Sequence, residues 1–180
     1  MANKEGRQKI TKTKYDALSI AKYLLSLDPK REYFDNKKIE NKITLAVAIR
    51  GNFRLNQMLY LLQMLYYLEH KELLFEDGLY AWENGAVAYS VYTHFWSLYN
   101  NINGKSIKIV EDKKIKNFID EYFRYLKEIP DEVLQEISYD DPARSATWAR
   151  SPQPNINFTN EENLKFYQQF RSRWLQEVRV

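Results

Sequence analysis

Residues 52–69 read NFRLNQMLYLLQMLYYLE, a stretch that contains no glycine or proline and is rich in Leu and Met. This composition favours a long helix. Apolar side chains fall on one face and on much of the opposite side, at Leu55, Met58, Leu59, Leu62, Leu65 and Tyr66 and at Leu61, Met64 and Leu68. A helix that is apolar nearly all round is usually buried. The sequence therefore predicts an all-α, compact single-domain bundle around a central buried helix at about residues 53–69.

A narrow polar stripe interrupts this helix, because Asn56, Tyr60, Gln63 and Tyr67 recur at i, i+4, i+7 and i+11. Their hydrogen-bonding groups must find partners or water. The plainer interpretation is that the stripe bonds to neighbouring loops inside the domain, as buried polar groups generally do. The second interpretation is a recognition surface, since Tyr, Asn and Gln combine rigid contact area with adaptable hydrogen bonds. Periodicity alone leaves both open.

Length and composition predict one soluble domain. A chain of 180 residues with 44% hydrophobic content is long enough for one well-filled core. We expect a flexible segment at residues 1–12 and a single helical domain at residues 13–180. Residues 1–12 lack the apolar stretch of a secretory signal, and the longest nearly apolar run, residues 58–68, is too short to span a bilayer. The absence of cysteine agrees with a cytoplasmic protein. We expect no membrane partner.

The charge pattern gives little support to nucleic-acid binding. The net charge is +3, and a basic excess lies in residues 1–54, which carry 13 Lys or Arg against 6 acidic residues. We interpret this excess as a solvated surface and do not expect nucleic acid to be a partner. A nucleic-acid-binding accessory protein stays an alternative.

Residue patterns of the common catalytic and cofactor sites are missing. His70 and His94 have no acidic or histidine partner at a metal-ligand spacing, and the five glycines are spread singly, so they form no phosphate-binding loop. The adjacent Asp140 and Asp141 would point apart on a helix or strand, so we interpret them as loop or cap residues. We expect no catalytic residue, no cofactor, no metal and no enzyme activity.

The remaining elements are predicted around the central helix. We expect further helices at residues 15–27, from residue 86 to about 100, from a cap at Asp112 to 126, from Pro130 to about 138, and from a capping box at Thr159 to about 176. Residues 45–49 suit a strand or a helix equally. Trp82 is expected to pack into the core between two turns, and Gly85 to permit the second turn at positive φ. The total is five to seven helices with at most a small two-stranded β ribbon.

Three of these segments carry motifs that resemble the Panacea domain family, also described as antitoxin SocA-like or phage-associated proteins. The family's central helix has the form KLQKLLYxxQxxYL, which residues 54–60 (RLNQMLY) with Gln63, Tyr67 and Leu68 resemble. Its PLFxDxxxAWxxGPV segment is similar to residues 74–77 and 81–87, and Tyr92 stands where the next helix carries a Tyr. Residues 15–24 resemble its first helix. The chain departs from the family pattern at Asn56-Gln57, Ala86 and Tyr139.

The resemblance implies a mostly helical domain of bacterial or phage toxin–antitoxin systems that uses no cofactor. Such a domain neutralises a cognate toxin by direct protein binding or, alternatively, acts as an adaptor that delivers the toxin to a protease. The partner-binding residues that it implies in this chain are Asn56, Tyr60, Gln63, Tyr67, Trp82 and Tyr92. The sequence leaves the identity of the toxin and the oligomeric state open.

Overall fold

The computed structural model of the protein describes residues 13–42, 44–100, 107–142, 154, 156–157 and 160–177. Along this part of the chain the elements are α1 (Ala17–Ser26), β1 (Lys38–Glu40), β2 (Val47–Ile49), α2 (Arg50–His70), β3 (Tyr80–Trp82), β4 (Gly85–Val87), α3 (Tyr89–Asn100), α4 (Lys113–Leu126), α5 (Asp131–Asp140) and α7 (Glu161–Glu177). The predicted mostly helical fold is confirmed. The segment at residues 1–12 and the cap at Thr159 lie outside the described residues.

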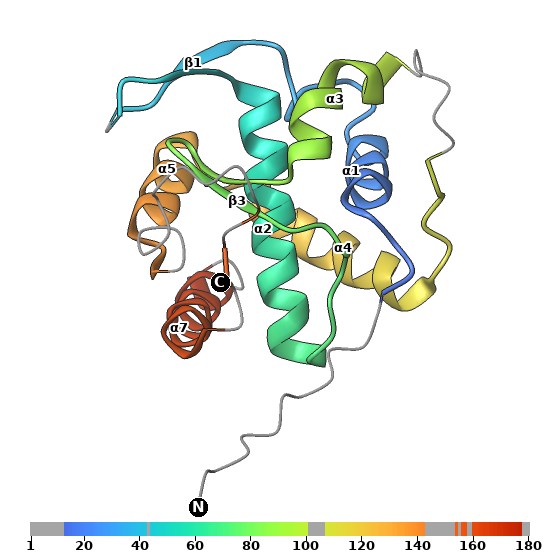
Figure 1. Cartoon of the computed structure of the whole chain (residues 1–180), viewed down its shortest axis with the longest axis vertical. Helices are drawn as coiled ribbons and strands as arrows, with labels where there is room; N and C mark the ends of the chain where they lie inside the picture. Colours follow the sequence, from blue (N-terminus) through green and yellow to red (C-terminus); the bar gives the residue numbers. More distant parts are fainter. Residues whose placement is uncertain are drawn as a thin grey trace, which may run out of the picture.

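Helix α2 runs through the middle of the molecule (Figure 1). Helices α1, α3, α4, α5 and α7 all contact it, and every residue from 53 to 67 is buried. Fully burying a Leu or Met side chain contributes roughly 1.5 to 3 kcal/mol, so packing on all sides is what stabilises α2. The predicted central buried helix is confirmed.

Short polar side chains fix where several helices begin. Asp16 caps α1 by accepting from the backbone N–H of Ser19 at 2.8 Å. The predicted cap at Asp112 is confirmed, because its carboxylate accepts from the N–H groups of Lys114 and Ile115. These bonds satisfy amides that have no partner within their own helix.

Each of the two β ribbons consists of two antiparallel strands within the described residues, where the sequence predicts at most one ribbon. Strand β1 pairs with β2 through Lys38 opposite Ile49, and β3 pairs with β4 through Ala81 opposite Ala86. Residues 45–49, which suit strand or helix from sequence, thus supply β2. The helix predicted from residue 86 begins only at Tyr89, because the chain first pairs with β3.

The prediction that Trp82 packs into the core is wrong, and the prediction that Gly85 has a positive φ is confirmed. Trp82 is half-buried rather than in the core. The physical reason is strand alternation: Ala81 is 2% exposed and points inward, so Tyr80 and Trp82 point to the opposite face. Gly85 has a φ of +119°, a conformation that L side chains rarely adopt.

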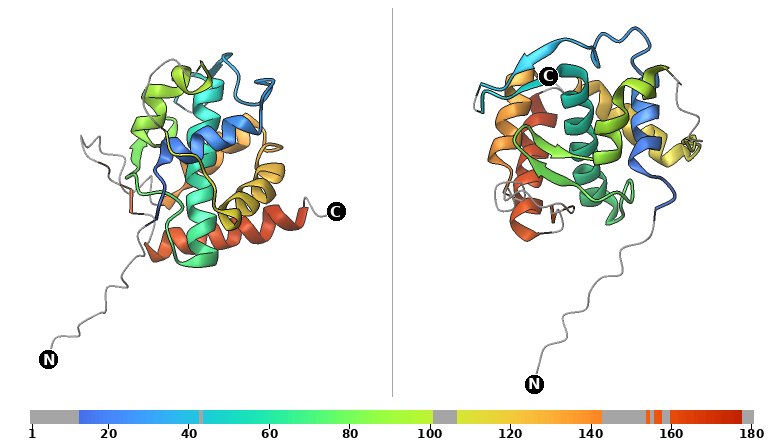
Figure 2. Two further views of the ribbon diagram at one scale, coloured as in Figure 1. Left: turned by 90° about the vertical axis from the view of Figure 1, so that its right-hand side faces the viewer. Right: turned by 45° about the horizontal axis from the view of Figure 1, so that its top comes forward.

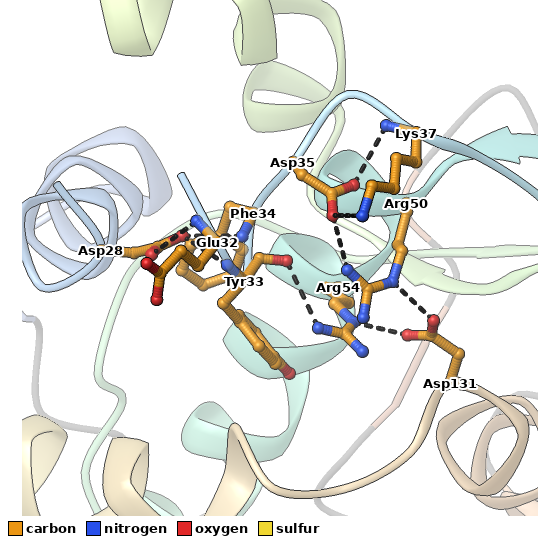
Figure 3. A network of polar contacts seen from close by, with 9 residues as sticks. All are labelled: Asp28, Glu32, Tyr33, Phe34, Asp35, Lys37, Arg50, Arg54 and Asp131. Atoms are coloured by element: carbon orange, nitrogen blue, oxygen red, sulfur yellow. Dashed lines mark hydrogen bonds and ion pairs between the residues drawn. The ribbon is translucent and has the colours of Figure 1, made fainter. Parts of the chain in front are cut away.

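Charged side chains join the start of α2 to α5 and to the loop before β1 (Figure 3). Asp131 accepts from Nε of Arg50 at 2.7 Å and from Nε of Arg54 at 2.5 Å, while Asp35 accepts from Nη1 of Arg50 at 2.6 Å. The Arg54 guanidinium also lies 4.3 Å from the centre of the Tyr33 ring. This network, defined by Arg50, Arg54, Asp131 and Asp35, fixes the point at which β2 enters α2.

Candidate partner-binding groove

A groove with a volume of about 720 Å³ opens beside the first half of α2. One wall is formed by β2 and the residue before it, and the other by the β3–β4 ribbon and Tyr92 of α3. Residues 52, 53, 56 and 57 of α2 form the floor. Figure 2 shows both ribbons beside α2. Segments that are far apart in the sequence therefore build one concave surface.

The structure divides the six predicted partner-binding residues into two sets. Asn56, Trp82 and Tyr92 line the groove. The other three, Tyr60, Gln63 and Tyr67, are buried further along α2 and do not line it. The polar stripe thus begins at the floor of the groove and continues into the interior.

Amide side chains on the floor hold the neighbouring wall in place. The Oδ1 atom of Asn56 accepts from the backbone N–H of Ala88 at 3.0 Å, just before α3. The Nε2 atom of Gln57 donates to the carbonyl oxygen of Asn84 at 3.0 Å, in the turn of the β3–β4 ribbon. Asn52 donates to the backbone oxygen of Tyr92 at 3.1 Å. These bonds position the ribbon and α3 against α2.

The interior part of the stripe bonds inside the domain. Gln63 accepts from the N–H groups of Leu74 and Phe75 at 2.7 and 3.3 Å, and donates to the Phe75 carbonyl at 3.0 Å. Tyr60 accepts from Nδ2 of Asn163 at 3.3 Å, and burial raises the pKa of the Tyr60 phenol well above its usual value. The hydrogen bonds of Tyr60 and Gln63 are therefore those of side chains that hold the interior of the domain together.

The adjacent carboxylates differ in environment. Asp141 is fully buried at the end of α5, where its Oδ2 atom accepts from the Tyr167 hydroxyl at 2.5 Å. Asp140, the last residue of α5, is exposed. Their interpretation as cap or loop residues agrees with these positions, and Asp141 serves to hold α7 against α5.

Four aromatic side chains form a cluster along one side of the groove. We name Tyr80, Trp82, Tyr89 and Tyr92 the aromatic rim. The Trp82 ring centre lies 4.9 Å from that of Tyr92 and 6.3 Å from that of Tyr89, which in turn lies 5.8 Å from Tyr80. Tyr89 and Tyr92 are 53% and 44% exposed. Tyr80 and Trp82 are half-buried, so the cluster is a partly exposed aromatic surface, which makes it a candidate interaction site.

Tyr80 and Tyr89 were not among the residues predicted from the sequence to bind a partner. The signals that identify them are short-range: Tyr80 alternates with Trp82 on a strand, and Tyr89 precedes Tyr92 by three residues on a helix, so each pair shares a face. The groove residues of β2, Val47–Ile49, were also not predicted. A three-residue strand is too short to show a periodic sequence pattern.

Apolar and amide groups dominate the chemistry of the groove. Lys38 and Glu83 are the charged residues among its lining. Within the part of the chain that the structure describes, no cluster of three or more His, Cys, Asp or Glu side chains is arranged to hold a metal ion. No described helix is long and apolar enough to cross a membrane. Aromatic groups beside a few amides are typical of protein-recognition surfaces.

Comparison with known proteins identifies one family. The sequence model of the family described as antitoxin SocA-like, Panacea domain, matches residues 55–164, which is more than half of the chain. No curated protein and no solved structure matches the chain significantly. The matched range contains most of α2, the β3–β4 ribbon and α3, whereas the β1–β2 ribbon precedes it. The chain belongs to the antitoxin SocA-like, Panacea domain family.

Proposed function

We propose that this protein is an antitoxin that neutralises a cognate toxin in the cytoplasm by binding it directly through the groove and the aromatic rim. Family membership supports an antitoxin-like role and a protein partner. The observation that carries the proposal is the partly exposed aromatic rim beside a groove of about 720 Å³. Tyr and Trp are the residue types that most often dominate binding energy at protein interfaces.

Pre-organisation of the rim supports binding over a structural role. Trp82 is held edge-on against Tyr92, with an interplanar angle of 76°. The β3–β4 ribbon that carries Trp82 is fixed to α2 by the bond from Gln57 to Asn84. Side chains that are already ordered lose little conformational entropy when a partner covers them. The rim therefore offers contact area at low entropic cost.

Co-expression tests this proposal. The candidate toxins are the products of the reading frames adjacent to the gene, and protection is measured as growth. Trp82→Ala and Tyr92→Ala should each weaken toxin binding by about 2 kcal/mol or more, roughly thirtyfold, and reduce protection. Because both side chains are partly exposed, the thermal melt of each variant should stay near that of the wild type.

A matched control uses an exposed aromatic residue away from the groove. Tyr139 is 52% exposed and does not line the groove, so Tyr139→Ala should protect as well as the wild type. If the wild-type protein protects against no neighbouring gene product and recovers no partner in a pull-down, the antitoxin proposal is wrong. If Trp82→Ala and Tyr92→Ala both protect fully, the toxin does not bind through the groove.

A further inference from the structure

We propose that the outer edge of β2 receives an extended segment of the partner protein, which adds to the β1–β2 ribbon as a third strand. This inference rests on the proposed function and specifies how the partner enters the groove. The segment carries an apolar side chain that reaches the aromatic rim and an acidic residue that faces Lys38.

The hydrogen-bond pattern of the ribbon shows which backbone groups of β2 point outward. The N–H of Arg50 donates to the Lys37 carbonyl at 2.8 Å, and the N–H of Asn41 donates to the Ala46 carbonyl at 2.9 Å. In an antiparallel pair the bonded residues alternate along each strand. The backbone groups of residues 46, 48 and 50 therefore face β1. Those of Val47 and the N–H of Ile49 face away from it.

This outer edge opens into the groove. Four consecutive residues, 46–49, line it, whereas β1 contributes only Lys38. Successive side chains of a strand point to opposite faces. A cavity that touches four in a row therefore meets the edge of the strand rather than one of its faces. An added strand would lie inside the groove.

The two edges of the ribbon differ in how they are protected. Strand β1 carries the exposed charges of Lys38 and Glu40, which discourage pairing at its edge. Residues 45–49 carry no charge and no proline, and Val47 is 64% exposed. Among the described residues, no strand pairs with β2 on the side to which the backbone groups of Val47 point. An open, apolar edge of this kind is a template for strand addition.

The groove also defines the chemistry of the segment. Lys38 is exposed and forms no ion pair with a described residue, so an acidic side chain of the partner would complement it. Exposed Val47 and the aromatic rim favour a β-branched or aromatic side chain at the position that faces the groove. The occupant is therefore an extended protein segment in which apolar residues alternate and one neighbour is acidic.

Substitution of Val47 separates backbone pairing from side-chain contact. Val47→Pro removes the outward N–H and is tolerated where that group faces away from the paired strand. Val47→Thr keeps the N–H and the β-branched shape, and is the matched control. The probe is a displayed library of random ten-residue peptides selected on the wild-type protein. We expect selected peptides to bind Val47→Pro roughly tenfold more weakly, as loss of one well-made hydrogen bond predicts, and Val47→Thr nearly as well as the wild type.

Hydrogen exchange on the wild-type protein gives a second measurement that does not depend on the proline variant. A bound peptide should protect the amides of Val47 and Ile49, while the amide of Ala48, which faces β1, should change little. Lys38→Glu should also weaken peptides that contain an acidic residue. Equal binding by Val47→Pro, unchanged exchange at both outward amides, or a library without binders would each overturn the proposal.

The outcomes also separate this inference from the antitoxin proposal. If Val47→Pro still protects against the toxin but Trp82→Ala does not, strand addition is wrong and the groove still binds the toxin. If the wild-type protein forms a dimer that Val47→Pro abolishes, a second copy of this chain occupies the edge, and the proposed occupant is wrong. If the wild-type protein does not protect against any candidate toxin, only the antitoxin proposal is contradicted. The strand-addition proposal is tested separately, because peptide binding is measured without the toxin.

Discussion

Gln63 is a polar side chain with no exposed surface in the middle of the central buried helix α2. Its amide holds the segment after α2 through three hydrogen bonds to Leu74 and Phe75. Gln63→Leu leaves those buried backbone groups without a partner and should lower the free energy of unfolding by roughly 1 to 3 kcal/mol. Chemical denaturation measures this loss.

The control for Gln63→Leu is Gln168→Leu, at an exposed position of α7, which should change the unfolding free energy by less than about 0.5 kcal/mol. An unchanged stability of Gln63→Leu would contradict the interior role of the amide. Loss of toxin protection without loss of stability would restore the interpretation of Gln63 as a contact residue.

Gly85 combines a positive φ with a close approach of two elements. A Cβ atom at this position would lie 1.9 Å from Nε2 of Gln57 on α2 and 2.2 Å from Oγ of Ser138 on α5. Gly85→Ala should therefore lower the free energy of unfolding by roughly 2 to 6 kcal/mol, the sum of backbone strain and steric overlap. Equilibrium denaturation measures this change.

A double variant separates the two causes at Gly85. Combining Gly85→Ala with Gln57→Ala removes one clash but keeps the strained φ, so the combined loss should be smaller than the sum of the two single losses. Strict additivity would show that Gln57 yields to the new methyl group at no cost.

At the scale of elements, the network of Arg50, Arg54, Asp131 and Asp35 decides how α5 and the β1–β2 ribbon attach to α2. Arg54 is 7% exposed, and Asp131→Asn would remove the carboxylate that both arginines share. We expect a loss of roughly 2 to 4 kcal/mol in unfolding free energy, somewhat below the cost for a fully buried pair because Arg50 and Asp131 are partly exposed.

The neighbouring Glu132 provides the control for Asp131→Asn. It pairs with Lys42 at 3.3 Å on the surface, so Glu132→Gln should leave the denaturation midpoint near that of the wild type. Equal effects of the two substitutions would show that the network contributes no more than an ordinary surface ion pair.

The elements also show what sequence reasoning can reach. Helix α2 was predictable because its apolar residues cover every side, and α4 because Asp112 marks its start and one face is apolar. The start of α3 was not, because the pairing of β4 with β3 depends on contacts of Gly85 with α2 and α5. Trp82 is a related case: its orientation follows from strand register rather than from hydrophobicity.

For the whole molecule, buried and half-buried tyrosines predict how the free energy of unfolding depends on alkaline pH. Burial, and next the hydrogen bond to Asp120, raise the pKa of Tyr23 to about 12. Burial also raises the pKa values of Tyr33, Tyr60, Tyr122 and Tyr167. Unfolded tyrosines lose their protons near pH 10. These groups therefore contribute full stability below about pH 10, and this contribution falls as the pH rises toward 12 and above.

Denaturation midpoints measured from neutral pH to about pH 12, together with tyrosinate absorbance, check this prediction. Tyr23→Phe removes one of the phenol groups with a raised pKa. The denaturation midpoint of this variant should therefore fall less steeply above about pH 10 than that of the wild type. A midpoint that stays constant to pH 12 would contradict the raised pKa values.

The sequence predicted some residues of the candidate site but not the wall formed by β2. Asn56, Trp82 and Tyr92 belong to motifs that the sequence displays, and the fold brings them to one groove. The wall formed by β2 depends on pairing with β1 across a loop and on the network at the start of α2. Neither contact leaves a periodic signal in so short a segment.

The β1–β2 ribbon supplies one wall of the groove, whereas α2 supplies its floor. The ribbon ends at Ile49, and the family match begins at residue 55, inside the helix that supplies the scaffold. One wall of the groove therefore lies outside the residues of this chain that the family match covers. Substitutions at residues 46–49 should therefore alter that wall while the helices that support the groove keep their packing.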